Sequence, residues 1–168
     1  MIDYREATPG DAAALSALFA DCFTTTFGDL YAPHNLALFL SQQSPQAFAA
    51  QLADPDFAFC LAEEGDRLAG YIKLGPPDLP GPTPPATIEL RQLYVQPEWQ
   101  GEGVAAALTD WAFNEARRRG KHHLQLSVFV DNPRARRFYE KRGFVEVGDY
   151  KFMVGDHEDD DRIMRVAL

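Results

Sequence analysis

With 168 residues the chain is long enough to bury a sizeable core, and its length predicts a single domain spanning residues 1–168. The formal net charge of −9 argues against nucleic acid and anionic membranes as main partners, because both need a basic surface. The N-terminus lacks the layout of a secretory signal and no apolar run is long enough to cross a bilayer, so we expect a cytoplasmic globular protein.

The first third of the chain is expected to form one strand and two helical regions. Residues 2–7 alternate like a short strand, and residues 8–11 supply a turn and a helix N-cap. The helix that follows has an apolar face, which contains Ala14, Leu15, Leu18, Phe19 and Cys22. Residues 24–31 break that pattern and are predicted to form a loop. A second helical region is expected over residues 35–53, interrupted near Ser44 and Pro45.

A hairpin and a proline-rich loop are predicted next. Residues 57–62 and 67–74 are apolar strands, joined by an acidic turn that contains a glycine. The proline density of residues 75–86 excludes both a helix and a strand ladder there. We therefore expect an exposed, partly extended loop.

The stretch from residue 88 to residue 105 is predicted to be a strand, a turn and a helix start around which the fold is organised. Ile88 and Leu90 share one parity of the strand alternation, whereas Leu93 and Val95 share the other. This change of phase predicts one extra residue, a β-bulge near Arg91 or the residue after it. Such a bulge would bend the strand away from its neighbour and leave backbone groups free to pair with a ligand.

Two glycines lie where the next helix is expected to begin. Pro97 ends the strand because it cannot donate to a ladder, and apolar residues recur at helical spacing after Gly103. Without side chains at Gly101 and Gly103, backbone N–H groups at the positive end of the helix dipole can close on a phosphate or pyrophosphate. Taken alone, the two glycines are explained more simply by a plain strand-to-helix turn.

The remainder of the chain alternates strands and helices. Residues 124–130 are predicted to form a strand after a helix that ends near Gly120, and Asn132 and Pro133 begin another helix. This order is typical of parallel strand pairing. Gly143 ends the last helix, and residues 144–148 and 162–166 are expected to be closing strands joined by an acidic connection at residues 155–161.

Two linked patterns make the ligand interpretation of the glycines specific. The first is Gln100-x-x-Gly103-x-Ala105. The second is Asn132-x-x-Ala135-x-x-Phe138-Tyr139-x-x-x-Gly143-Phe144. Together they resemble the GNAT superfamily of acyl-CoA-dependent N-acyltransferases, closely over residues 86–150 and by element order across the chain. The resemblance implies an α/β fold, a single GNAT domain whose mixed, mostly antiparallel sheet is splayed at a bulged strand and flanked by helices.

The resemblance also implies how acetyl-CoA, the expected cosubstrate, would be held. In GNAT proteins the first pattern holds the CoA pyrophosphate through backbone N–H groups, the strand before it pairs with pantetheine, and the second pattern supplies an Asn on the pantetheine side. Carried over to this sequence, the cofactor-binding residues are Leu93, Tyr94, Val95, Gln100, Gly101, Glu102, Gly103, Val104, Ala105 and Asn132.

Acetyl transfer from a thioester to an amine needs mainly correct positioning, by direct attack without a protein nucleophile. The resemblance places Tyr139 beside the thioester sulfur, as a general acid near a helix start. Glu89 lies at a strand position where some family members have a base, but a solvated strand residue or a water chain is an open alternative. Cys22 and Cys60 are isolated and are expected to be reduced, buried thiols. The histidines lack metal-ligand spacing, so no metal is expected.

The acceptor is the least constrained part of the prediction. Asp29, Tyr31 and His34 are candidates for contact with it, although solvated loop residues explain them equally well. The C-terminal segment resembles, more loosely, the branch that includes bacterial polyamine acetyltransferases. We expect a primary amine as acceptor, with a small polyamine as the first choice and a basic peptide N-terminus as the second, and with a homodimer as one open assembly. The alternative function is a catalytically silent acyl-CoA-binding sensor or regulatory module.

Overall fold

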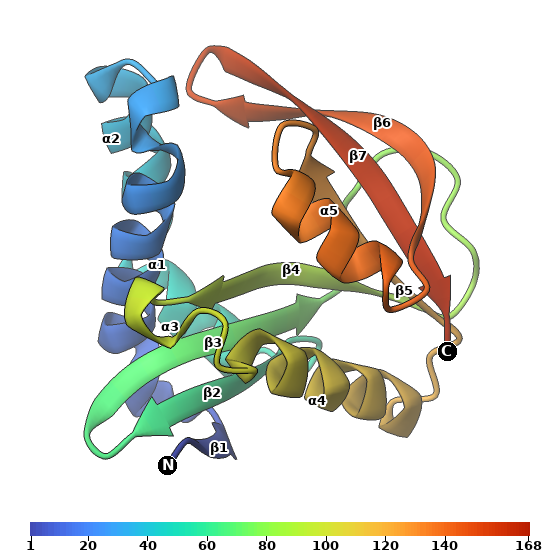
Figure 1. The fold of residues 1–168 in the computed structure, drawn as a ribbon, viewed down its shortest axis with the longest axis horizontal. Coiled ribbons are helices and arrows are strands. Elements are labelled where there is room, and N and C mark those ends of the chain that lie inside the picture. Colours follow the sequence, from blue (N-terminus) through green and yellow to red (C-terminus); the bar gives the residue numbers. More distant parts are fainter.

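The computed structural model describes residues 1–168 and contains one seven-stranded sheet with helices on both faces (Figure 1). The strands are β1 (Asp3–Glu6), β2 (Ala58–Glu64), β3 (Arg67–Gly75), β4 (Thr87–Val95), β5 (His123–Phe129), β6 (Val145–Val154) and β7 (His157–Ala167). The α-helices are α1 (Ala12–Phe27), α2 (Pro33–Ser41), α3 (Pro45–Ala53), α4 (Val104–Arg118) and α5 (Pro133–Glu140). Short 3-10 turns are η1 (Pro9–Asp11), η2 (Gly28–Leu30) and η3 (Pro97–Trp99).

The strand order in the sheet is β1-β2-β3-β4-β5-β7-β6, and all neighbours are antiparallel except β4 and β5. The parallel pairing of β4 with β5 covers only Thr87–Glu89 of β4. Beyond that point the two strands separate, because a register shift puts an extra residue, Arg91, into β4 between the residues that pair with Lys73 and Leu74. The predicted bulge and the splayed, mostly antiparallel sheet are confirmed.

Two apolar clusters cover the two faces of the sheet. Helix α4 and residues of α5 pack over one face, with Leu108, Leu124 and Tyr139 among the buried side chains. Helices α1, α2 and α3 pack over the other face, where Phe19 and Phe48 are fully buried. We call these the α4/α5 face and the α1/α2 face. No helix has the length and apolar character needed to cross a membrane.

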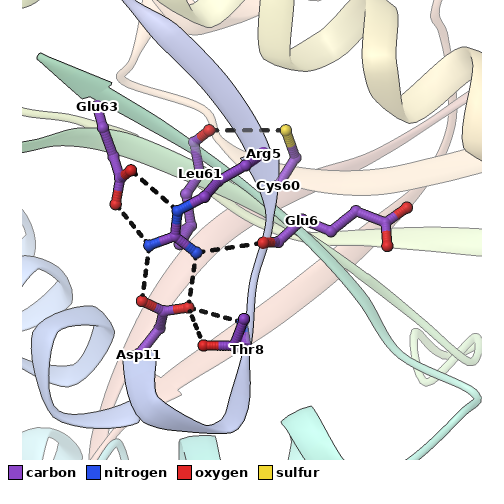
Figure 2. Close-up of polar contacts among 7 residues, drawn as sticks. All are labelled: Arg5, Glu6, Thr8, Asp11, Cys60, Leu61 and Glu63. Carbon is purple, nitrogen blue, oxygen red and sulfur yellow. Dashed lines mark hydrogen bonds and ion pairs between the residues drawn. The ribbon is translucent and has the colours of Figure 1, made fainter.

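The N-terminal strand is fixed to the sheet and to the start of α1 by one guanidinium (Figure 2). Arg5 donates to both carboxylate oxygens of Glu63 on β2 at 2.9 and 2.6 Å, and to both oxygens of Asp11 at 2.9 Å. Asp11 also accepts from the backbone N–H and hydroxyl of Thr8. These bidentate contacts are the strong, geometrically specific kind, and they hold the pKa of Asp11 well below its usual range, chiefly through the Arg5 hydrogen bonds.

Two predicted boundaries differ from the structure. The loop expected at residues 24–31 is helical as far as Phe27, because that ring packs on Phe23 at 5.3 Å and on Phe129 at 6.2 Å. Such tertiary contacts outweigh the weak helix propensity of the three threonines before it. The acidic connection expected at residues 155–161 is also wrong: only Gly155 and Asp156 form the turn, and the acidic residues belong to β7.

Candidate active site

The separation of β4 and β5 opens a cleft of about 530 Å³ between the two faces of the sheet. Residues 90–95 of β4 line one side, and Ser127, Val128 and Phe129 of β5 line the other. On the α4/α5 face the cleft is bordered by Gln100, Ala105 and residues of α5. On the α1/α2 face it is bordered by aromatic side chains and by two carboxylates of β7. The free edge of β4 therefore faces a cleft, as the bulge predicted.

The glycine loop lies where α4 begins. Gly101 and Gly103 have φ of +89° and +84°, a backbone conformation that favours glycine, and Gly103 is the N-cap of α4. A Cβ built on either glycine would have no neighbour within 4 Å. The loop therefore needs glycine for its backbone shape, and it leaves open space in front of the helix N-terminus. This arrangement suits a phosphate group, because backbone N–H groups and the helix dipole both favour an anion there.

A hydrogen-bond chain connects this loop to α5. The Gln100 amide donates to the carbonyl of Val95 at 3.0 Å, and its oxygen accepts from Arg134 at 3.0 Å. The Asn132 side chain accepts from the N–H of Ala135 at 3.2 Å and so caps α5. The two sequence patterns thus meet at one side of the cleft, which places an arginine beside the glycine loop.

Tyr139 lines the cleft on the α4/α5 face and is 9% exposed. It lies in the last turn of α5, not near the helix start as expected from the sequence. Its ring packs on Phe138 at 5.2 Å and on Phe144 at 5.5 Å. Burial raises the pKa of the phenol well above its usual value, so Tyr139 keeps its proton at neutral pH. A protonated phenol in this place can donate a proton to a leaving group.

Aromatic rings dominate the cleft on the α1/α2 face. Those that line it are Phe19, Phe23, Phe27, Phe39, Phe129 and Phe152, together with Tyr31. Tyr31 stacks on Phe23 at 5.8 Å and donates its hydroxyl to Asp159. Such a lining favours an apolar or cationic guest, since aromatic faces attract cations.

Asp159 and Asp161 are the two acidic residues in the cleft lining, and each is 6% exposed. Their register partners are Phe152 for Asp159 and Phe129 for Asp161, and both rings pack against helices of the α1/α2 face. Both carboxylates therefore project to that face. Asp159 is held by the Tyr31 hydroxyl and by His157 at 3.2 Å, whereas Oδ1 of Asp161 is buried without a hydrogen-bond partner.

Comparison with known proteins identifies the family. The family model for the acetyltransferase (GNAT) family matches residues 13–144. An uncharacterised N-acetyltransferase of Mycobacterium tuberculosis is 34% identical over 155 residues, which are 92% of this chain and 96% of the relative. The chain belongs to the GNAT acetyltransferase family. It is an acyl-CoA-dependent N-acetyltransferase of the GNAT type.

Solved GNAT structures have the same fold. A PaiA N-acetyltransferase from Thermoplasma acidophilum in complex with coenzyme A superposes with a TM-score of 0.81 at 20% identity, covering 100% of this chain and 99% of the other. A spermidine N-acetyltransferase from Vibrio cholerae in complex with CoA and spermine gives a TM-score of 0.71 at 22% identity, covering 99% and 95%. At these identities the match establishes the fold alone.

The structure does not bring Glu89, the predicted base, into the cleft of this GNAT enzyme. Glu89 is 4% exposed and lies before the bulge, where its Oε2 accepts from the N–H groups of Asp78 and Leu79 and from Gln125. Oε1 lies 3.4 Å from Arg91. The carboxylate therefore holds the proline-rich loop against β4 of the sheet.

The remaining predicted residues of the GNAT site divide into two groups. Those that line the cleft are Leu93, Tyr94, Val95, Gln100, Ala105, Asn132, Tyr139 and, from the acceptor candidates, Tyr31. Gly101, Glu102 and Gly103 are exposed beside it, and Val104 is buried in the core. Asp29 and His34 are exposed and do not line the cleft. Cys22 lines it, but burial raises its thiol pKa to about 11, so the thiolate is scarce and Cys22 is a poor nucleophile.

Proposed function

We propose that this GNAT enzyme transfers an acetyl group from acetyl-CoA to a primary amine carried on an apolar body, by direct attack within the cleft. The observation that supports this most is the different lining of the two faces of one cleft. The α4/α5 face has the glycine loop, Arg134 and Tyr139, which suit the phosphates and the thioester of acetyl-CoA. The α1/α2 face has aromatic rings and carboxylates, which suit an amine.

Only one of the two carboxylates in the cleft is free to receive a cation, which favours an acceptor with one positive charge. Asp159 is already engaged by Tyr31 and His157, which leaves Asp161 to receive an ammonium group. The aromatic rings around it supply apolar contact and cation–π attraction for the rest of the molecule. An arylalkyl or alkyl amine meets both conditions.

A polyamine is the second candidate, and a basic peptide N-terminus the third. Two acidic residues in the cleft favour a polyamine if Asp159 exchanges its internal partners for a second ammonium. A polyamine would then have to place charged groups among the phenylalanines, with a desolvation cost that a single ammonium avoids.

The test is a steady-state comparison of matched amines by release of CoA thiol, with the acetylated product identified by mass spectrometry. We compare 2-phenylethylamine with ethylamine, which lacks the ring, and with spermidine and a basic peptide. Burying a phenyl group contributes about 1.5–3 kcal/mol, so kcat/KM for 2-phenylethylamine should exceed that for ethylamine by about 10- to 150-fold.

Two results would contradict the proposal in different ways. A higher kcat/KM for spermidine than for 2-phenylethylamine would assign a polyamine acceptor. CoA binding without acetyl transfer to any amine in the set would remove the primary-amine reaction altogether.

A further inference from the structure

Asp161 is a cleft residue whose carboxylate has one buried oxygen without a hydrogen-bond partner in the protein. Its side chain lines the cleft from β7, it is 6% exposed, and its Oδ1 is buried with no hydrogen-bond partner. A buried carboxylate oxygen without a partner costs free energy, so it is retained where a ligand completes it. Its place on the α1/α2 face indicates that this ligand is the acceptor.

The Asp161 carboxylate forms no ion pair, although the charge of Arg162 lowers its pKa. The nearby titratable groups are Asp159, Asp160 and Arg162 on its own strand, Tyr31 before α2, Tyr94 on β4 and Tyr150 on β6. Arg162 donates to the backbone carbonyl of Asp161, and its Nε lies 3.5 Å from Asp149. The tyrosines keep their protons at neutral pH, because burial raises their pKa values.

Burial, followed by repulsion from Asp159, raises the pKa of Asp161 to about 7, and a hydrogen bond from the Ser127 side chain opposes this shift without reaching the unpartnered Oδ1. A carboxylate with a pKa near the working pH combines a useful ionised fraction with useful basicity. The carboxylate of Asp159 is already held by the Tyr31 hydroxyl and by His157.

We propose that Asp161 is the general base that takes the proton from the ammonium group of the acceptor. This rests on the proposed function, and it deepens it by naming the group that makes the amine nucleophilic. Glu89, the base expected from the sequence, accepts hydrogen bonds from the proline-rich loop and does not line the cleft.

Asp161, Tyr139 and solvent together account for every proton that is transferred in the reaction. Asp161 accepts one proton from the ammonium and releases it to solvent, and the neutral nitrogen attacks the thioester carbonyl. As the C–N bond forms and the C–S bond breaks, Tyr139 gives a proton to the departing sulfur. The nitrogen then loses its second proton to the Asp161 carboxylate, and the Tyr139 phenolate regains a proton from solvent, so that one proton is released overall. The products are the N-acetyl amine and CoA thiol.

The decisive measurement is the pH profile of kcat/KM for 2-phenylethylamine, whose ammonium has a pKa near that of an ordinary alkylamine. If Asp161 takes the proton, kcat/KM should rise as the Asp161 carboxylate ionises, through about pH 7, and then stay level well below the pKa of the amine. If no protein base acts, kcat/KM should keep rising with the fraction of free amine.

Asp161→Asn should lower kcat by about 10²- to 10³-fold, the range for a lost general base, and should convert the levelled profile into a continuous rise. The matched control is Asp160→Asn on the same strand, which is exposed and paired with Lys151. It should keep the rate and the level region of the profile, and move its midpoint only to slightly lower pH, because the Asp160 charge raises the pKa of Asp161. CoA affinity should be unchanged in both variants.

Three outcomes would overturn the proposal. Equal rates and profiles for Asp161→Asn and Asp160→Asn would do so while leaving acetyl transfer to amines intact. If Asp161→Asn does not fold, a wild-type profile without the level region would do so by itself. Absence of acetyl transfer to any amine by the wild-type protein would remove both this proposal and the proposed function.

Discussion

Replacing Gly103 by alanine tests the phosphate loop, because the structure separates the backbone cost of the change from its effect on a ligand. Gly103 has φ of +84°, and a Cβ there meets no protein atom within 4 Å. The left-handed conformation costs a residue with a side chain about 1–2 kcal/mol. With about 2.1 cal/mol/K of unfolding entropy for each of the 168 residues, this lowers Tm by about 3–6 °C.

Gly120→Ala is the matched control, at the opposite end of the same helix. Gly120 has φ of +68° and equally open space around its Cβ position, so its replacement should lower Tm by a similar amount. Only Gly103→Ala puts a methyl group into the space assigned to the pyrophosphate. Losing one charge-assisted hydrogen bond costs about 1.5–3 kcal/mol, so CoA affinity should fall by about 10- to 150-fold in that variant alone.

Isothermal titration with CoA and thermal unfolding together decide the matter. If Gly103→Ala showed the expected decrease in Tm but bound CoA as tightly as the wild-type protein, the phosphates would have to be held elsewhere. That result would refute the assignment of the loop. Loss of CoA affinity in Gly120→Ala to the same extent would show a general effect on α4 instead.

Two further substitutions test other parts of the account. Tyr139→Phe keeps the contacts with Phe138 and Phe144 and should leave Tm and CoA affinity unchanged while lowering kcat by about 10²- to 10³-fold; an unchanged kcat in single-turnover measurements would reject the general acid. Lys73 is 4% exposed, and burial lowers its pKa to about 7, so stability should decline as pH falls from the unfolded pKa of about 10.5 towards 7 and stay level below that. This residue alone should cost about 2 kcal/mol of unfolding free energy between pH 9 and pH 7. Lys73→Met should remove that decline, and urea titrations of both proteins at the two pH values would show whether it does.

The bulged strand could be located from the sequence because Ile88 and Leu90 before the bulge and Leu93 and Val95 after it pack against the same apolar cluster. One extra residue between the two pairs therefore changes the parity of the alternation. Ile88 and Leu90 are buried before the bulge, and the phase changes at Arg91, where the structure places the extra residue. The glycine loop could be predicted equally well, because a positive φ at a helix start favours glycine, which can be recognised in the sequence.

The acidic side of the cleft could not be predicted in the same way. A strand is recognised by alternation of apolar and polar residues, but residues 158–161 are all acidic. Buried Asp159 and Asp161 alternate with exposed Glu158 and Asp160, and the residue types do not reveal this alternation. The distinction comes from pairing with β5 and β6, which places alternate side chains against the aromatic rings.

The contacts of Glu89 show a second limit of sequence reasoning. Its position on β4 was found correctly, but its side chain accepts hydrogen bonds from backbone N–H groups of an irregular loop, which lie ten and eleven residues earlier in the chain. A partner set made by an irregular loop has no periodic signature. Only the folded arrangement distinguishes this anchoring carboxylate from one that reaches a substrate.

A structure with a bisubstrate analogue, in which 2-phenylethylamine is joined through an acetyl bridge to the sulfur of CoA, tests the central claim most directly. We expect the pyrophosphate to lie against the backbone N–H groups at the start of α4, and the amine nitrogen to lie within hydrogen-bond distance of Asp161. Its phenyl ring should lie among the aromatic side chains of the α1/α2 face. An analogue that binds with its nitrogen remote from Asp161, or with its phosphates away from Gly103, would contradict that claim.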